Sequence, residues 1–286
     1  MLSRAERALA EIEKNPDTRL RIYEPKEGEM TQKQLDAAWV RRLKAALDDN
    51  RFHLLFQPIV QLDGGGIERY EVFMEMRDEK GERVPTAEFM PAAERTKMSK
   101  ILDRWVITQS LARLIEQKKK HPAMVFFVKL SGGSLEDLEL FRWISEKVRG
   151  SGLSKWSLVF EVKEEAVLAH LKQAQAFATL LKTIHCGFAI DDFGKGPDPF
   201  KLVELVPAQY LKFHSDFTRD LVKNKENQAR LQEITERAKK LKKHTIVQHV
   251  EDAATLSVLW TIGATFTQGN FFQGPSETLN YDFSAG

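Results

Sequence analysis

Large apolar residues recur every fourth position in the segment 31-TQKQLDAAWVRRLKAALDDN-50, and charged residues fill its opposite face. The apolar stripe consists of Leu35, Trp39, Leu43 and Leu47. This spacing predicts an amphipathic helix that packs against another part of the protein. Thr31 is the expected N-cap, because a threonine hydroxyl can accept a hydrogen bond from an unpaired N–H of the first turn.

From residue 52 onward, short apolar runs alternate with helical patterns. The predicted strands are 52–62, 69–77, 124–131, 157–164, 186–193, 209–214, 244–250 and 265–272. The predicted helices between them are 99–118, 135–149, 165–183, 227–242 and 252–262. Regular alternation of strands and helices favours a single TIM-type (β/α)8 barrel. An open, doubly wound sheet is the alternative.

The first two predicted strands are not separated by a helix. Only the short run 63-DGGG-66 lies near their junction, and glycine-rich turns of this kind join antiparallel strands. The predicted fold is therefore an α/β protein, a modified (β/α)8 barrel with one antiparallel strand.

The N-terminal region has a different pattern from the rest. Residues 1–13 predict a helix and 19-RLRIYE-24 a short strand, while 25-PKEGEM-30 has the proline, glycine and charge of a linker. We therefore divide the chain into a short N-terminal piece, 1–30, and a barrel domain, 31–286.

Composition narrows the class of protein. Of the 286 residues, 42% are hydrophobic and 29% are charged, as in ordinary globular domains. No apolar run approaches the ~20 residues of a membrane span. The first 15 residues are charged, unlike a signal peptide, and Cys186 is the single cysteine. These features lead us to expect a cytoplasmic protein without membrane insertion. The net charge of +2 is too small to favour a nucleic acid polymer as partner.

Charged and amide side chains stand at the ends of most predicted strands. They are Glu71, Lys129, Glu161, Lys163, Glu164, Asp191, Asp192, Lys212, His214, Gln248, Glu251 and Gln268. Taken singly, most such residues are solvated or cap a turn. Because the C-terminal ends of barrel strands together form the functional site, their repetition at one level predicts a site there.

These residues lie in motifs that resemble, in order and spacing, those of EAL domains, the cyclic di-GMP phosphodiesterases and their inactive relatives. The motifs are 56-FQPIV-60, 71-EVF-73, 128-VKLS-131, 160-FEVKE-164, 191-DDFG-194, 210-YLKFH-214, 247-VQHVED-252 and 268-QGNFF-272. The resemblance covers about residues 40–280. Residues 4–24 also resemble the last helix and strand of a GGDEF domain, which implies that 1–30 is the remnant of one.

The resemblance implies a two-metal mechanism that this chain departs from. The family's functional positions are matched by Glu71, Glu161, Asp191, Asp192, Lys212 and Gln268. Three other positions differ: Lys129 replaces an asparagine, His214 an aspartate and Gln248 a glutamate. Lysine can supply positive charge where a cation sat but cannot activate water as a metal does. We therefore expect a vestigial catalytic site, with Lys129, Lys163 and Lys212 compensating the carboxylates and no metal bound.

Cyclic di-GMP is the ligand that the resemblance implies. The expected binding residues are Gln57, Glu71, Phe73, Asp103, Glu251 and Gln268. Phe73 would contact a guanine face, and Asp103 would accept hydrogen bonds from guanine N–H groups. Glu75 argues against binding, because many relatives have a phosphate-binding arginine there.

Three functions remain open at this point. The first is an inactive EAL domain that binds cyclic di-GMP and signals to a protein partner. The EVF tripeptide and the C-terminal run resemble degenerate GGDEF–EAL regulators of type IV pili, which implies a PilZ-type partner. The alternatives are a ligand-free interaction scaffold and a weak cyclic di-GMP phosphodiesterase.

Overall fold

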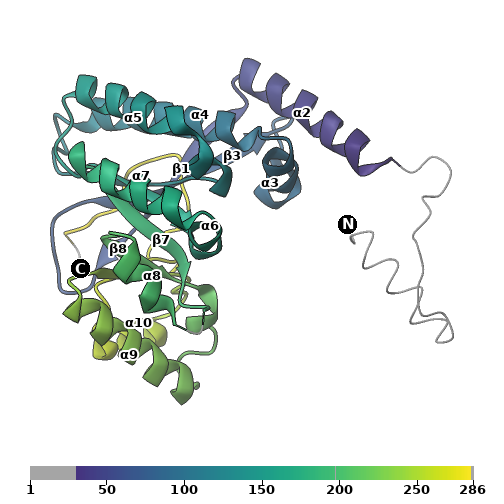
Figure 1. The fold of residues 1–286 in the computed structure, drawn as a ribbon. Helices are drawn as coiled ribbons and strands as arrows, with labels where there is room; N and C mark the ends of the chain where they lie inside the picture. The colour runs from purple at the N-terminus through teal and green to yellow at the C-terminus, as the bar shows by residue number, and fades with distance from the viewer. Residues whose placement is uncertain (1–29, 197, 285–286) are drawn as a thin grey trace, which may run out of the picture.

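The computed structural model describes residues 30–196 and 198–284 of the chain, and their strands form a nearly closed barrel (Figure 1). In sheet order the strands are β1 (Phe52–Pro58), β3 (Arg69–Arg77), β5 (Val125–Lys129), β6 (Leu158–Lys163), β7 (Gly187–Phe193), β8 (Tyr210–Phe213), β9 (His244–Val247), β10 (Phe266–Thr267) and β2 (Val60–Gln61). A short β4 (Arg83–Val84) pairs with β3 off this path. Because β1 leads directly into β2, the sheet returns to its own start. The barrel is confirmed and the open sheet is wrong.

One strand of the barrel runs against the others, as the sequence predicts. β1 pairs antiparallel with β3 from Phe52↔Met76 to Pro58↔Tyr70, and β2 pairs antiparallel with β10. The remaining neighbours, from β3 to β10, are parallel. The turn between β2 and β3 contains Gly64 at φ +78°, a conformation that glycine adopts at little cost.

Helices cover the outside of the barrel (Figure 1). They are α2 (Gln32–Asp48), α3 (Thr86–Arg95), α4 (Ser99–Gln117), α5 (Leu138–Ser151), α6 (Glu164–Ala169), α7 (Leu171–Thr183), α8 (Pro199–Leu205), α9 (Lys225–Lys240) and α10 (Ala253–Ile262), with 3-10 turns η1 (Gly132–Glu136) and η2 (Ser215–Phe217). Thr31 caps α2 in a reciprocal capping box with Gln34, as expected. The apolar stripe of α2 packs onto the top of the barrel, where Leu43 is fully buried beside Phe52 and Phe89.

Three sequence predictions about elements need correction. The helix expected over 165–183 is two helices, because His170 leaves helical geometry at φ −124° and ψ 45°. The strand expected over 265–272 ends at Thr267, because the chain turns at 269–272. Helices α3 and α8 were not predicted, and prolines inside α3 and at the start of α8 obscure their patterns. The helix and strand expected within residues 1–24 lie outside the described residues.

The interior of the barrel is closed at its lower end by apolar side chains. This plug consists of Ile59, Phe127, Val159, Ala189, Ile246 and Phe266, each at most 2% exposed. A second apolar layer fills the space between the sheet and the helices. The barrel is therefore a packed core with access from its C-terminal end only, which is where the polar strand ends lie.

Candidate functional site

The charged site sits directly above the apolar plug because alternate residues of a strand share a face. On β5 the plug residue Phe127 is followed two positions later by Lys129. On β6, Val159 is followed in the same way by Glu161, and on β7 Ala189 is followed by Asp191. Strand alternation thus places a charged layer directly after an apolar layer. The sheet register pairs Lys129 with Glu161 across β5 and β6, and Lys163 with Asp191 across β6 and β7.

Two lysines bridge three buried carboxylates in this layer. Lys129 Nζ lies 2.8 Å from Glu71 Oε1 and 3.2 Å from Asp191 Oδ2. Lys212, which is 0% exposed, pairs with Glu71 Oε2 and lies 3.2 Å from Glu161 Oε2. An ammonium group therefore lies between Glu71 and Asp191, and another between Glu71 and Glu161.

Burial and these charges together set the protonation of the cluster. Burial disfavours an ionised Glu71, but Lys129 and Lys212 outweigh it and lower the pKa of Glu71 to about 2. Asp191 also has a lowered pKa, since the two lysines outweigh its burial. Burial raises the pKa of Glu161 to about 8, and only Lys212 lies close enough to oppose it strongly.

The net charge of the cluster follows from these pKa shifts. Desolvation opposes the charged form of Lys129 and of Lys212, but the pKa of each lysine is raised because its ammonium faces carboxylates. At neutral pH the two lysines are therefore charged, Glu71 and Asp191 are ionised, and Glu161 holds a proton. The charges cancel without any added ion.

Amide side chains complete the floor of the site. Gln268 donates to Gln57 Oε1 at 2.9 Å and also to Glu71 Oε2. Gln57 in turn donates to the carbonyl of Gln273 at 3.1 Å. Next to Gln268, Gly269 lies so close to the backbone of Val250 that a Cβ atom would overlap it. The close approach at Gly269 fixes Gln268 beneath the cluster.

Gln248 contacts the cluster from the end of β9, the strand next to β10. Its Nε2 lies 3.2 Å from Asp191 Oδ1 and 3.1 Å from the carbonyl of Phe213. An amide here satisfies Asp191 as a hydrogen-bond donor, which a glutamate at this position could not do when ionised. His214 turns away from the cluster and caps η2, where its Nδ1 accepts from the N–H of Asp216 at 3.1 Å.

A cavity of about 820 Å³ opens above the cluster at the C-terminal end of the barrel. Of the predicted site residues it is lined by Phe73, Asp103, Lys129, Glu161, Lys163 and Asp191. Met90 and Pro91 of α3 and His170 after α6 also line it. This volume lies within the range of cavities that hold ligands of a few hundred daltons.

Asp103 reaches the cavity from α4 and is held by a pair of serines. Its Oδ2 accepts hydrogen bonds from Ser131 N at 2.9 Å, Ser131 Oγ at 2.7 Å and Ser134 Oγ at 2.6 Å. All three bonds fall on one carboxylate oxygen, so the other oxygen has none of them. Burial raises the pKa of Asp103 to about 6, although the serine hydrogen bonds oppose this. The sequence pattern did not indicate this clamp.

Two predicted residues lie elsewhere than the sequence suggests. Glu75 is absent from the lining of the cavity and is neutralised by two arginines, with Arg83 Nε 3.1 Å from Oε2 and Arg77 Nε 3.3 Å from Oε1. The argument that Glu75 opposes a bound phosphate therefore loses its basis. Glu251 is exposed and lines a separate cavity with Arg219 and His249. Its predicted role in ligand binding stays a prediction without support from this placement.

The arrangement does not fit a divalent metal ion. The Lys129 ammonium group occupies the space between Glu71 and Asp191 that a shared cation would otherwise take. Within residues 30–196 and 198–284, no group of three or more His, Cys, Asp or Glu side chains is arranged to hold a metal. Asp192, beside Asp191, points to Lys163 at 3.5 Å instead of into the cluster.

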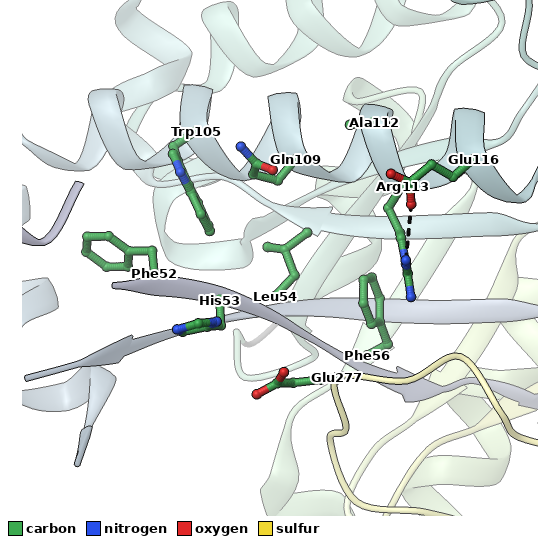
Figure 2. A pocket seen from close by; sticks show the side chains of 10 residues that line it. All are labelled: Phe52, His53, Leu54, Phe56, Trp105, Gln109, Ala112, Arg113, Glu116 and Glu277. Carbon is green, nitrogen blue, oxygen red and sulfur yellow. Dashed lines mark hydrogen bonds and ion pairs between the residues drawn. The ribbon is translucent and has the colours of Figure 1, made fainter. Parts of the chain in front are cut away.

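A second cavity, of about 350 Å³, lies outside the barrel between β1 and α4 (Figure 2). Leu54 and Phe56 of β1 face Trp105 and Arg113 of α4 across it. None of the predicted site residues lines this cavity, so we place the functional site in the larger one.

Comparison with known proteins agrees with this geometry. The EAL domain family matches residues 40–275 of the chain. The FimX EAL domain of Pseudomonas aeruginosa bound to c-di-GMP is 38% identical, with a TM-score of 0.82, over 86% of this chain and 99% of that one. The Xanthomonas citri FimX EAL domain in complex with c-di-GMP is 27% identical, with a TM-score of 0.82, over 88% and 98%. The chain belongs to the EAL domain family.

Curated relatives include enzymes of this family. The chain is 30% identical over 246 residues to the cyclic di-GMP phosphodiesterase PdeF of Escherichia coli (strain K12). The matched region covers 85% of this chain and 33% of that protein. The cyclic di-GMP phosphodiesterase PdeB of Shewanella oneidensis is 25% identical, over 92% of this chain and 31% of that protein. The chain thus spans about a third of the length of these relatives. No described helix is both long and apolar enough to cross a membrane.

Proposed function

We propose that this domain is a cyclic di-GMP receptor without phosphodiesterase activity. The observation that carries the proposal is Lys129, whose ammonium group bridges Glu71 and Asp191 below the open cavity, at a position where the resemblance implies an asparagine. In the two-metal chemistry of the family, the metal ions would activate the attacking water. An ammonium group cannot lower the pKa of water as a metal ion does. The cavity remains open for a ligand of cyclic di-GMP size while the catalytic charge pattern is neutralised.

The ligand would lie across the C-terminal mouth of the barrel, where Phe73 and Asp103 offer complementary contacts. The Phe73 ring lines the cavity and has Lys129 Nζ 5.6 Å from its centroid. A ring in this position can stack on a guanine, and the Asp103 carboxylate can accept from guanine N–H groups. Gln57 and Gln268 lie deeper, where Gln268 donates to Glu71 and to Gln57. We therefore propose direct ligand contacts for Phe73 and Asp103, and a supporting role for the two glutamines.

Calorimetry with cyclic di-GMP tests this function. Binding should be saturable, and it should be the same in Mg²⁺ as in EDTA, because the lysines supply the charge that a metal would. The nucleotide should be recovered intact afterwards. Binding that requires Mg²⁺, or recovery of linear dinucleotide, would instead favour a weak phosphodiesterase. Absence of any binding would favour a ligand-free scaffold.

Replacing Phe73 by alanine should weaken cyclic di-GMP binding by about 1–3 kcal/mol, because stacking of a base on an aromatic ring is lost. Phe73→Tyr keeps the ring and is the matched control, which should bind within about threefold of the wild type. An unchanged affinity of the alanine variant would remove Phe73 from the binding site.

Binding should also weaken as the pH falls through the pKa of Asp103, about 6. The ionised carboxylate accepts guanine N–H groups, so affinity should drop about tenfold between pH 7.5 and pH 5. The free energy of unfolding should change in the opposite direction to the affinity. Because the folded protein raises the pKa of Asp103 from 3.8 to about 6, protonation of Asp103 stabilises the fold as the pH falls from about 6 toward 3.8. Asp103→Asn should bind more weakly at pH 7.5 and lose this pH dependence. If both proteins show the same pH profile, Asp103 does not read the ligand.

We further propose that the domain acts in the bacterial cytoplasm and signals to a PilZ-type protein of the type IV pilus machinery. The 38% identity to the FimX EAL domain over almost its full length supports this choice of pathway. Purified domain should bind a purified PilZ-type partner with an affinity that changes with cyclic di-GMP. Equal affinity with and without the nucleotide would argue against nucleotide-dependent signalling to this partner.

A further inference from the structure

Three lysines of the site, Lys212 on β8, Lys129 on β5 and Lys163 on β6, differ in how far their side chains are exposed. Lys212 is 0% exposed, Lys129 40% and Lys163 65%. Lys163 follows Glu161 by two residues on β6, so it shares the same strand face one level higher. It lines the cavity above the carboxylate cluster.

The two lower lysines are already committed to buried carboxylates. Lys212 holds Glu71 and Glu161, and Lys129 holds Glu71 and Asp191. Drawing either ammonium away would leave a carboxylate buried without its partner, which is costly. Neither lysine is therefore free to move toward an anionic ligand.

Lys163 forms a much weaker ion pair than the two lower lysines. Its Nζ lies 3.5 Å from Oδ2 of Asp192, whose side chain is 35% exposed. An exposed pair at this distance contributes little and exchanges readily with solvent. Of the positively chargeable residues that line the described cavity, Lys129, Lys163 and His170, only Lys163 combines a permanent charge with a partner it can release at low cost.

The ligand needs such a cation. Cyclic di-GMP carries two phosphodiester charges, whereas the cavity is lined by the carboxyl groups of Glu94, Asp103 and Glu165 in addition to the charge-balanced cluster. Carboxylates repel an anion that enters the cavity, unless a cation is available to bind it. On the basis of the proposed receptor function, we propose that Lys163 is the phosphate-binding residue of this cavity and that Asp192 competes with the ligand for it.

Substitutions of Lys163 and of Asp192 should change the affinity for cyclic di-GMP in opposite directions. Lys163→Met keeps the length of the aliphatic stem and removes the charge, so cyclic di-GMP should bind about 3–10-fold more weakly. Lys163→Arg should retain most of the affinity. Asp192→Asn should bind about 2–5-fold more tightly, because Lys163 loses its internal partner. Asp192 has φ +53°, a conformation that asparagine also tolerates, so this variant keeps the backbone geometry.

Calorimetry on the four proteins of the double-mutant cycle, at 50 and 300 mM salt, tests the proposal. The gain from Asp192→Asn should vanish in the Lys163→Met background, because the competition no longer exists. Added salt should weaken the wild type more than Lys163→Met. Lys201→Met removes an equal charge from exposed α8 outside the cavity and is the matched control, which should bind like the wild type.

Each result distinguishes the phosphate contact from the receptor function itself. A wild type that binds while Lys163→Met binds equally well overturns the role of Lys163 and leaves the receptor function standing. Asp192→Asn that tightens binding in both backgrounds overturns the competition between Asp192 and the ligand. A wild type that binds no cyclic di-GMP overturns the receptor function and this proposal with it.

Discussion

Replacing Lys212 by methionine should lower the free energy of unfolding by about 3–5 kcal/mol at neutral pH, which is the cost of leaving buried charge without its partner. Lys212 is fully buried and is the ammonium that Glu71 and Glu161 share. Methionine fills a similar volume, so the loss reports mainly on charge.

The pH dependence of this loss separates charge from packing. In the wild type the pKa of Glu71 is about 2, below its ordinary 4.5, so its ionised form stabilises the fold above that ordinary value, and this stabilisation is lost as the pH falls toward 2. Without Lys212 part of that contribution disappears, and Lys129 supplies the rest. The part of the difference between wild type and variant that comes from Glu71 should therefore be fully present above about pH 4.5 and shrink as the pH falls toward 2.

Urea unfolding at several pH values measures this difference, with Lys201→Met as an exposed lysine control that should stay within about 0.5 kcal/mol of the wild type. A Lys212→Met protein within about 1 kcal/mol of the wild type at pH 7 would mean that the buried cluster relaxes without its central cation. A deficit that is the same at pH 7 and at pH 2 would mean that packing, not charge, is what methionine disturbs.

Restoring the family's metal-binding pattern should require three changes together. Lys129→Asn alone should leave cyclic di-GMP intact in Mn²⁺, because Gln248 still donates to Asp191 and His214 still caps η2. The triple variant Lys129→Asn, His214→Asp, Gln248→Glu removes one ammonium and adds two carboxylates. We expect it to bind Mn²⁺ saturably, since only a divalent ion can then balance the charge.

Calorimetric titration with Mn²⁺ and chromatographic analysis of the nucleotide provide the two measurements. His214→Asp with Gln248→Glu, which keeps Lys129, is the matched control and should bind Mn²⁺ much more weakly than the triple variant. Stoichiometric Mn²⁺ binding by the wild type, or cleavage of cyclic di-GMP by Lys129→Asn alone, would contradict the idea that lysines have taken the place of the metal.

Strand alternation explains which parts of the site could be foreseen. Glu161 and Asp191 stand two residues after apolar positions on parallel strands, so a correct barrel assignment places them together without further information. The substitution of Lys129 for asparagine then indicates the charge compensation. These inferences use only local spacing and one global assumption, the closed parallel sheet.

Contacts between distant segments could not be foreseen in this way. Asp103 is held by Ser131 and Ser134, which follow a different strand, and nothing in either segment marks the pairing. Glu75 seemed to oppose a phosphate because its partner Arg83 lies on the unpredicted strand β4. Helix α3 lines the cavity, yet its internal Pro91 breaks the pattern by which helices are recognised.

The seam where the barrel closes has a consequence for synthesis on the ribosome. β1 is among the first strands made, but the side-chain contact across the seam, Gln57 to Gln268, joins residues 211 positions apart. Ser276, which pairs with Phe56 on the same edge, emerges later still. One edge of β1 therefore stays unpaired while the rest of the barrel is made, and the barrel can close only once residues 268–276 have left the exit tunnel.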